Sequence, residues 1–260
     1  MANHYYLTSS LPALEVGVSP EISLRDFDVL LRENLTDADF ARISILRRYY
    51  DIQNMRALWR EVELDSLGNL DEQELEEALL TRAGLPDYVC SYLDKYDDVE
   101  ARLRYFPTLV QAFFREEQEA ATGFLHDYLG FERDWRLVFV GFRAKQLGRD
   151  VTAELQFEDP SDDLVAQILA QRDVAHYEPP YRYEDLKPVF ERHAADPLGL
   201  HQALCQWRFD KIQEMYLGDL FSLDRVLGYY AQLIIVERWQ ELDRQRGASL
   251  LEDMVKAGSE

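Results

Sequence analysis

The chain has 260 residues, of which 47% are hydrophobic and 30% charged, proportions that exclude an intrinsically disordered protein. This length suits one large domain or two modest ones. The formal net charge of −21 argues against nucleic acid as a partner, because phosphate recognition depends on Lys and Arg displacing counterions.

Neither the cysteines nor the apolar segments indicate secretion or membrane insertion. Cys90 and Cys205 are too few and too far apart for a disulfide framework, so we expect two thiols in a reducing compartment. The opening MANHYYLTSSLPALEV lacks the basic leader and the unbroken apolar core of a signal peptide. The most apolar run, Val226 to Val236, is far shorter than the ~20 residues that span a bilayer. The sequence therefore predicts a cytoplasmic chain without direct membrane insertion.

Helical spacing of apolar residues dominates the first 100 residues. The segment YYLTSS at the start is the best candidate for a strand, since alternation is hard to find elsewhere. Gly84 is expected to end the helix over residues 72–83. The residues expected to cap or start the helices of this part are Ser23, Thr36, Asn69 or Asp71, and Pro86.

Pro107 is expected to open the longest helical region, which reaches about residue 147 and is broken or bent near Gly123 or Gly130. Residues 149–183 carry several prolines and predict short helices joined by turns. Helices resume at Asp185. A further helix is expected from Pro197 to about Tyr216, and Ser222 is expected to cap the last one, which ends near Gly247.

The sequence thus predicts an all-α fold, formed by one helical domain over residues 1–260. Two segments 80 residues apart indicate duplicated helical modules: YYDIQNMRALWR, from Tyr49, and GFERDWRLVFVGFR, from Gly130. Aligning Asn54 with Asp134 places Arg56 on Arg136 and apolar or aromatic residues on one another. The modules are expected over residues 1–106, 107–183 and 184–260.

No segment carries a convincing catalytic or metal-binding pattern. A calcium loop starting at Glu63 would place Gly68 and Glu74 correctly, but Leu67 would then stand where an oxygen ligand is needed. Phosphate-binding and nucleophile-elbow motifs are missing from the sequence. The sequence predicts no cofactor and no bound metal. A helical enzyme that uses His193, His201 and Cys205 remains the alternative from a different class of function.

Basic residues gather on the two similar segments. Arg56 and Arg136 fall inside apolar runs, so we expect them to be half-buried and paired with a carboxylate or a helix-end carbonyl. Two interpretations stay open: the arginines hold helices together, or part of this basic surface meets an acidic partner. The residues concerned are Arg42, Arg47, Arg48, Arg56 and Arg60 on the helix that carries the first segment, and Arg133, Arg136, Arg143, Lys145 and Arg149 on the helix that carries the second.

The first segment resembles the helix signature of the C subunit of V-type and archaeal-type ATP synthases, called d in eukaryotes. Asp51, Asn54 and Arg56 match its Asp-x-x-Asn-x-Arg pattern; Asp134 and Arg136 repeat two of the three positions, and Phe131 replaces the acid. Over nearly its full length the chain is also similar to a bacterial family of uncharacterised proteins encoded among V-type ATP synthase genes. The segments that carry this similarity are YYLTSSLPAL, FRAKQLGRD, YEPPYRYEDLKPVF and LGYYAQLIIVERWQELD.

This resemblance implies a fold related to that of the C subunit and a non-catalytic role. The expected function is a connector that links the central shaft to the membrane rotor ring, at the cytoplasmic side of the inner membrane and held there through the complex. The alternative is a helical adaptor or assembly factor of the same complex that does not rotate. The residues expected to carry the repeat motif or to contact partners are Arg48, Asp51, Asn54, Arg56, Asp134, Arg136 and Arg143.

Overall fold

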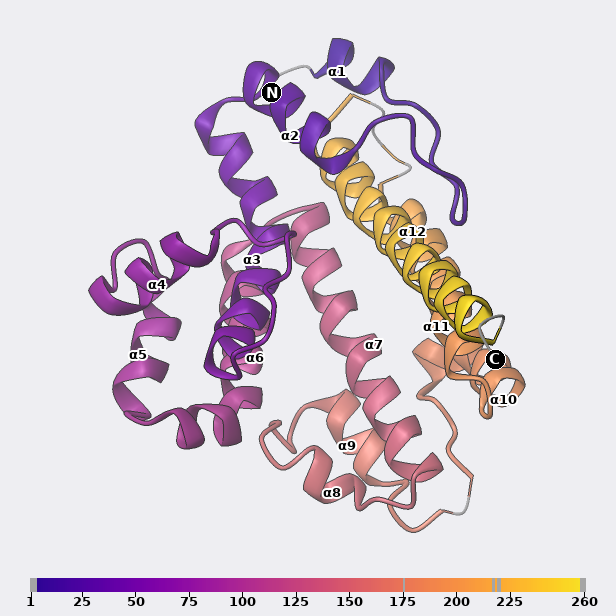
Figure 1. The fold of residues 1–260 in the computed structure, drawn as a ribbon. Helices are drawn as coiled ribbons and strands as arrows, with labels where there is room; N and C mark the ends of the chain where they lie inside the picture. The colour runs from indigo at the N-terminus through magenta and orange to yellow at the C-terminus, as the bar shows by residue number, and fades with distance from the viewer. Residues whose placement is uncertain (1–3, 175, 217, 219–220, 258–260) are drawn as a thin grey trace. The chain divides into compact units, whose positions relative to one another are not determined.

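The computed structural model describes residues 4–174, 176–216, 218 and 221–257, with side chains described as far as residue 241, and every regular element in these ranges is helical (Figure 1). The all-α prediction is therefore confirmed. The elements are α1 Tyr5–Ser9, α2 Leu24–Asn34, α3 Asp37–Trp59, α4 Glu72–Thr81, α5 Asp87–Lys95, α6 Val99–Ala120, α7 Phe124–Gln146, α8 Val151–Glu154, α9 Asp163–Leu169, the 3-10 helix η1 Tyr181–Leu186, α10 Lys187–His193, α11 Pro197–Met215 and α12 Leu223–Ala257.

The chain divides into two compact units. Unit 1 comprises residues 1–40 and 192–260, and unit 2 comprises residues 41–191. These limits differ from those of the three modules expected from the sequence. A division by spatial contacts does not test how the modules arose, so the single domain and its modules stay a prediction.

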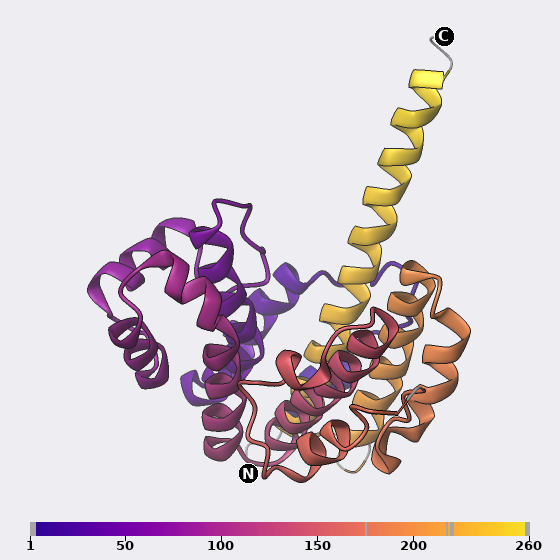
Figure 2. The ribbon, with the colours of Figure 1, turned by 90° about the horizontal axis from the view of Figure 1, so that it is seen from below.

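Unit 1 is organised around α12, against which α11 and α2 pack. The backbone N–H of Leu24, at the start of α2, donates to Glu237 at 2.7 Å, and the hydroxyl of Tyr230 donates to Asp28 at 2.9 Å. The buried ring of Phe27 lies 5.2 Å from that of Tyr229. Figure 2 shows α12 continuing past the end of α11. The run from Val226 to Val236 is buried and, apart from Gln232, without hydrophilic side chains other than tyrosine, so it contributes a large part of the unit's core.

Unit 2 is built on α6, which runs antiparallel to both α3 and α7. Tyr49 of α3 contacts Phe113 and Phe114 of α6, whereas Trp59, ten residues later in α3, contacts the earlier residue Phe106. Helix α7 packs along α6 (Figure 1) and also contacts α3, where Arg136 lies over the ring of Tyr49. The three long helices thus enclose the aromatic core of this unit, and the short α4, α5, α8 and α9 surround it.

The helix starts follow the expected caps. The hydroxyl of Ser23 accepts from the backbone of Asp26, and that of Thr36 accepts from the backbone of Asp39. Asp71 rather than Asn69 caps α4, in a reciprocal capping box with Glu74. Each of these side chains satisfies an N–H group that has no partner inside its helix. The short elements of residues 149–183 and the break at Gly123, with φ of 62°, are also as predicted.

Other boundaries were wrong. Pro107 does not open a helix but lies inside α6, which begins eight residues earlier because Asp98 caps the backbone N–H of Ala101 at 2.8 Å. A proline inside a helix removes one backbone N–H donor, and α6 accommodates Pro107 without ending there.

Three further expectations need correction. The segment YYLTSS forms α1, not a strand, with Thr8 and Ser10 donating back to carbonyls one turn earlier. Arg82, at φ of 66°, ends α4 in place of Gly84. Helix α12 continues through Gly247 to Ala257, because a single glycine inside a helix lowers its stability without ending it. Within the described residues no helix has the length and apolar character needed to cross a bilayer.

Gly228 is required where the ring of Tyr216 lies against α12. A Cβ at this position would lie 2.0 Å from the Tyr216 ring, whose hydroxyl is held by Gln232. We expect Gly228→Ala to lower the free energy of unfolding by about 1–3 kcal/mol, as overpacking of a core does, in spite of the better helix propensity of alanine. Urea denaturation measures this. Gly218→Ala is the control, since an added Cβ there meets nothing within 4 Å, and equal stability of the two variants would contradict the prediction.

Candidate functional site

The seven residues predicted from the repeat motif all lie in unit 2. Helix α3 carries Arg48, Asp51, Asn54 and Arg56, and α7 carries Asp134, Arg136 and Arg143. They do not form one site. The structure distributes them over two polar clusters, one aromatic junction and the exposed surface.

The carboxylate of Asp51 is buried and receives three hydrogen bonds from the loop between α3 and α4. Its donors are the backbone and side-chain N–H groups of Asn69, at 2.5 and 2.6 Å, and the backbone N–H of Leu70 at 3.1 Å. Burial raises the pKa of Asp51 above its ordinary value, although these hydrogen bonds and Arg47 oppose the rise. The acid of the motif therefore anchors a loop.

Asn54 anchors the other side of the same loop. Its side-chain amide donates to the carbonyl oxygen of Asp65 at 2.9 Å and accepts from the backbone N–H of Asp65 at 2.7 Å. A Cβ on Gly68 would lie 2.7 Å from this amide and 2.8 Å from the Asp51 carboxylate, so the loop approaches too closely for a side chain. Arg47 donates to the carbonyl oxygen of Leu67 at 3.0 Å. The segment that looked like a calcium loop in sequence is thus bound along its length by α3.

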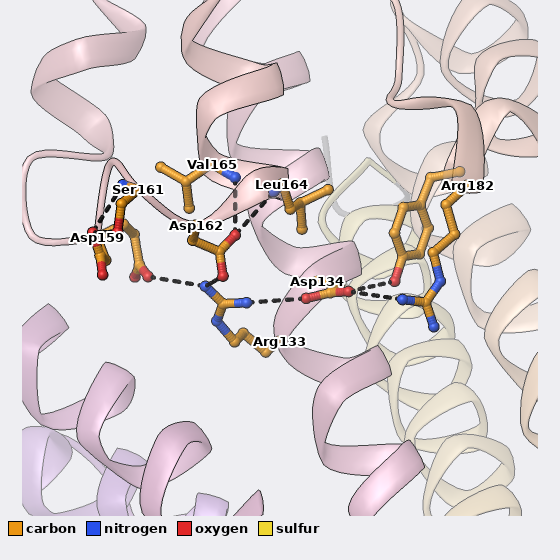
Figure 3. A network of polar contacts seen from close by, with 10 residues as sticks. Arg133, Asp134, Asp159, Ser161, Asp162, Leu164, Val165 and Arg182 are labelled. Carbon is orange, nitrogen blue, oxygen red and sulfur yellow. Dashed lines mark hydrogen bonds and ion pairs between the residues drawn. The ribbon is translucent and has the colours of Figure 1, made fainter.

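Asp134, the counterpart of Asn54, also holds segments that follow its own helix (Figure 3). Its carboxylate accepts from the hydroxyl of Tyr183 at 3.0 Å and pairs with Arg133 at 3.2 Å. Arg133 extends the cluster to Asp162 at 2.9 Å, and Asp162 caps α9 by accepting from the backbone N–H of Leu164. The cluster ties α7 to α9 and η1.

Two carboxyl groups of this second cluster are poorly solvated. Burial raises the pKa of Asp134, against the opposing effects of Tyr183, Arg133 and Arg182. Burial also raises the pKa of Glu158, which lies 3.9 Å from Arg133 and whose Oε2 has no hydrogen-bond partner among the described residues. The charge of Arg133 therefore favours the ionised forms of both carboxyl groups.

Arg136 lies where α3, α6 and α7 meet. It pairs with the carboxylate of Glu132, which is only 2% exposed, and donates to the Glu132 carbonyl oxygen at 2.6 Å. Its guanidinium lies 4.6 Å from the ring centre of Tyr49 and 5.5 Å from that of Phe114. Burial acts to lower the pKa of Arg136, but Glu132 outweighs it and the pKa is raised. The prediction of a half-buried, paired arginine is confirmed at this position.

The junction contains a small opening rather than a ligand pocket. It has about 290 Å³ of empty space, open solvent at its mouth included, lined by residues that include Tyr49, Phe114, Tyr128, Glu132 and Arg136. Arg136 and Glu132 of its lining are paired with each other, so few polar groups remain to form hydrogen bonds that would orient a small molecule.

Arg48 completes the polar contacts of this core. It pairs with Glu117 of α6 at 2.5 Å, and the hydroxyl of Tyr88 in α5 donates to the same oxygen at 2.9 Å. Burial, followed by the charge of Glu117, raises the pKa of Tyr88, so the phenol stays protonated and remains a donor. The buried glutamate is thus satisfied by α3 and α5 together.

Arg56 and Arg143 differ from the other predicted residues. Both are exposed, and their guanidinium groups lie over rings, 5.2 Å from the centre of Phe106 and 5.7 Å from that of Phe139. The expectation that Arg56 is half-buried and paired with a carboxylate was wrong, because the end of α3 places it at the surface on an aromatic side chain. The matched positions Arg56 and Arg136 therefore have different environments.

Sequence reasoning missed three partners in these clusters: Glu117, Glu132 and Tyr183. The four-residue spacing of Glu132 and Arg136 was the one signal available, since such a pair faces the same side of a helix. The other contacts join residues far apart in the chain and leave no local pattern.

Of the three residues of the enzyme alternative, His201 and Cys205 are in contact. The Sγ of Cys205 lies 3.4 Å from Nε2 of His201, and burial, with a smaller effect of Arg208, lowers the pKa of that imidazole. Among the described residues no group of three or more His, Cys, Asp or Glu side chains is arranged to hold a metal ion. An enzyme built on these residues stays a prediction without support.

The fold and these clusters define an all-helical protein whose repeated helices use their polar residues to bind the protein's own loops. The chain belongs to the family described as "Protein of unknown function (DUF2764)", whose sequence profile matches residues 1–258.

Relatives of the same length occur in Chlamydia, and each carries the description "Uncharacterized protein". The chain is 29% identical to one from Chlamydia trachomatis over 258 residues, 97% of each chain. It is 29% identical to one from Chlamydia muridarum, with 98% of each covered, and 28% identical to one from Chlamydia pneumoniae, with 99% of each covered. No solved structure matches the chain. Membership of an uncharacterised family is thereby confirmed, and the link to V-type ATP synthases stays a prediction.

Asn54→Ala removes both hydrogen bonds to Asp65 and leaves the buried backbone groups of the loop without that partner. We expect the free energy of unfolding to fall by about 1–3 kcal/mol and the loop over residues 61–71 to be cut faster by protease. Gln53→Ala, a half-buried neighbour in α3 without such contacts, is the control. Equal stability and equal cleavage in the two variants would show that the loop does not depend on Asn54.

Arg133→Gln is expected to raise the pKa of Asp134 further, because the arginine charge opposes the effect of burial. A folded pKa above the unfolded value means that the stability from Asp134 is fully present below about 3.8 and is lost as pH rises through the folded pKa. Carboxyl-carbon NMR titration measures the pKa. Arg172→Gln, whose partner is Asp173, is the control. A pKa of Asp134 that stays the same or falls would contradict the assignment.

Proposed function

We propose that the protein is a non-catalytic connector subunit of a V-type ATP synthase or ATPase, linking the central shaft to the membrane rotor ring. The observation that carries the proposal is the repeated helix motif, which resembles that of the C subunit. The two helices that bear it, α3 and α7, are both 23 residues long. At the matched positions Asn54 and Asp134 each bind a segment that follows their own helix. This shared arrangement supports an origin by duplication.

The polar clusters also suit a part that transmits force. A connector between two rotating parts must resist deformation, and ion pairs joined to aromatic packing hold α3, α6 and α7 in one arrangement. The Asp51 and Asn54 contacts restrain a loop that would otherwise be free to move. Rigidity of this kind needs no reactive group.

Affinity purification of the tagged full-length protein from native membranes in mild detergent tests the proposal. We expect quantitative mass spectrometry to recover the catalytic, shaft and ring subunits of the V-type enzyme, with one copy of this chain for each shaft. Recovery of the protein without any of these subunits would overturn the proposal.

The copy number separates the connector from the alternative of an adaptor or assembly factor. A rotor part stays in the active complex, whereas an assembly factor leaves it. Purification through a tag on the ring subunit, followed by an ATPase assay, provides the control. If the active complex lacks this chain and only incomplete complexes contain it, the assembly-factor interpretation replaces the connector.

A further inference from the structure

One end of the α3–α6 pair in unit 2 carries a continuous aromatic cluster. The ring of Trp59 lies 6.5 Å from that of Phe106 and 6.2 Å from that of Tyr92. The cluster continues from Tyr92 to Tyr96 at 5.0 Å and from Tyr96 to Tyr105 at 4.7 Å. Although Phe106 and Tyr92 are buried, the other three rings are half-buried and reach the surface.

Basic side chains lie over the rings of this cluster. The guanidinium of Arg56 is 5.2 Å from the ring centre of Phe106, that of Arg102 is 5.7 Å from Trp59, and that of Arg104 is 5.5 Å from Tyr105. Arg60 follows Arg56 by one helical turn, since its backbone N–H donates to the Arg56 carbonyl oxygen. We name the surface formed by Arg56, Trp59, Arg60, Arg102, Arg104 and Tyr105 the Arg–aromatic face.

The arginines of this face carry charge that the fold does not neutralise. Arg56, Arg60 and Arg104 are exposed, and none of them forms an ion pair with a carboxylate of the described residues. The stretches 54–60 and 101–114 each contain two arginines and no acidic residue, in a chain with 49 acidic and 28 basic residues. By contrast, Arg48, Arg133 and Arg136 of the same unit are paired with carboxylates.

Their position over aromatic rings prepares Arg56 and Arg104 for a particular ligand. A guanidinium that lies on a ring keeps its N–H groups free at its edge, where two of them can bind one carboxylate side by side. Because the ring also restricts the side chain, less conformational entropy is lost when the ligand binds. Arg, Trp and Tyr are the residues that contribute most to protein interfaces.

We propose that the Arg–aromatic face is a docking surface for an acidic segment of a protein partner, one that presents Asp and Glu carboxylates to Arg56, Arg60 and Arg104. A nucleic acid fits less well. Tyr96 and Tyr105 stack on each other with an angle of 11° between their planes, and guanidinium groups lie on other rings, so faces that bases would need are occupied.

The first experiment measures direct binding of fluorescently labelled poly-L-glutamate to the full-length protein at low salt, by fluorescence anisotropy. The test variant combines Arg56→Gln, Arg60→Gln and Arg104→Gln. The control combines Arg25→Gln, Arg32→Gln and Arg192→Gln, which changes the net charge equally. All three arginines are exposed, and Arg32 also lies over a ring, 4.2 Å from the centre of Phe40.

We expect the wild type and the control triple to bind poly-L-glutamate, and the test triple to bind at least about tenfold more weakly. Added salt should weaken binding, since exposed charges are screened. Urea denaturation should give similar stabilities for the two triples. Equal affinity of the two triples, no binding by the wild type, or stronger binding to single-stranded DNA of the same length would overturn the inference.

The identity of the partner rests on the proposed function, so a second measurement separates the two. Membrane purifications of the wild type and both triples are compared for recovery of the V-type shaft and ring subunits. If the test triple alone loses these subunits, the Arg–aromatic face contacts the rotary complex. If both triples recover them equally, the connector proposal stands and the face is not its contact. If the wild type recovers none but binds poly-L-glutamate through the face, the connector proposal fails and the docking surface stands.

Discussion

The structure of unit 2 depends on the neutralisation of two buried carboxylates, Glu117 and Glu132, at the junction of α3, α6 and α7. A buried charge is costly unless it is paired and hydrogen-bonded, so these glutamates require Arg48 and Arg136 at close range. Arg48 of α3 pairs with Glu117 of α6. Arg136 of α7 lies over Tyr49 of α3 and Phe114 of α6. Each pair thereby restricts how the helices can pack. Apolar burial stabilises the core, and the ion pairs select one arrangement of it.

The same principle operates at the loops. Backbone groups next to a core need hydrogen-bond partners, and the residues of the repeat motif supply them. Asp51 and Asn54 bind backbone groups of the loop before α4, whereas Asp134 holds η1 through the side-chain hydroxyl of Tyr183. Asp51, Asn54 and Asp134 of the motif thus support the fold. Under the docking proposal, partner recognition falls to Arg56, Arg60 and Arg104, which are exposed.

The sequence predicted the helices well where a local contact decides the boundary. Ser23, Thr36 and Asp71 were identified as caps because the capping bond joins residues three apart. Prediction failed where a residue type that often starts a helix stood close to a better capping residue. Pro107 suggested a helix start, but the cap at Asp98 comes first and the proline is accommodated within the helix. The polar clusters could be anticipated only in part: their arginines, Asp51 and Asp134 stood out, but Glu117 and Glu132, among 49 acidic residues, did not.

By itself, the sequence determined the all-helical class, most helix starts and the repeated motif, because periodicity and capping are properties of neighbouring residues. Only the tertiary structure decided which arginines are neutralised and which face solvent. Arg48 and its partner Glu117 are 69 positions apart. Arg56 and Arg136 occupy matched positions in the repeat, but Arg56 is exposed over a ring whereas Arg136 is paired with a buried carboxylate. Whether an arginine meets a carboxylate or a ring depends on which helices pack against its own, and that is set by the burial of the whole core rather than by any local pattern.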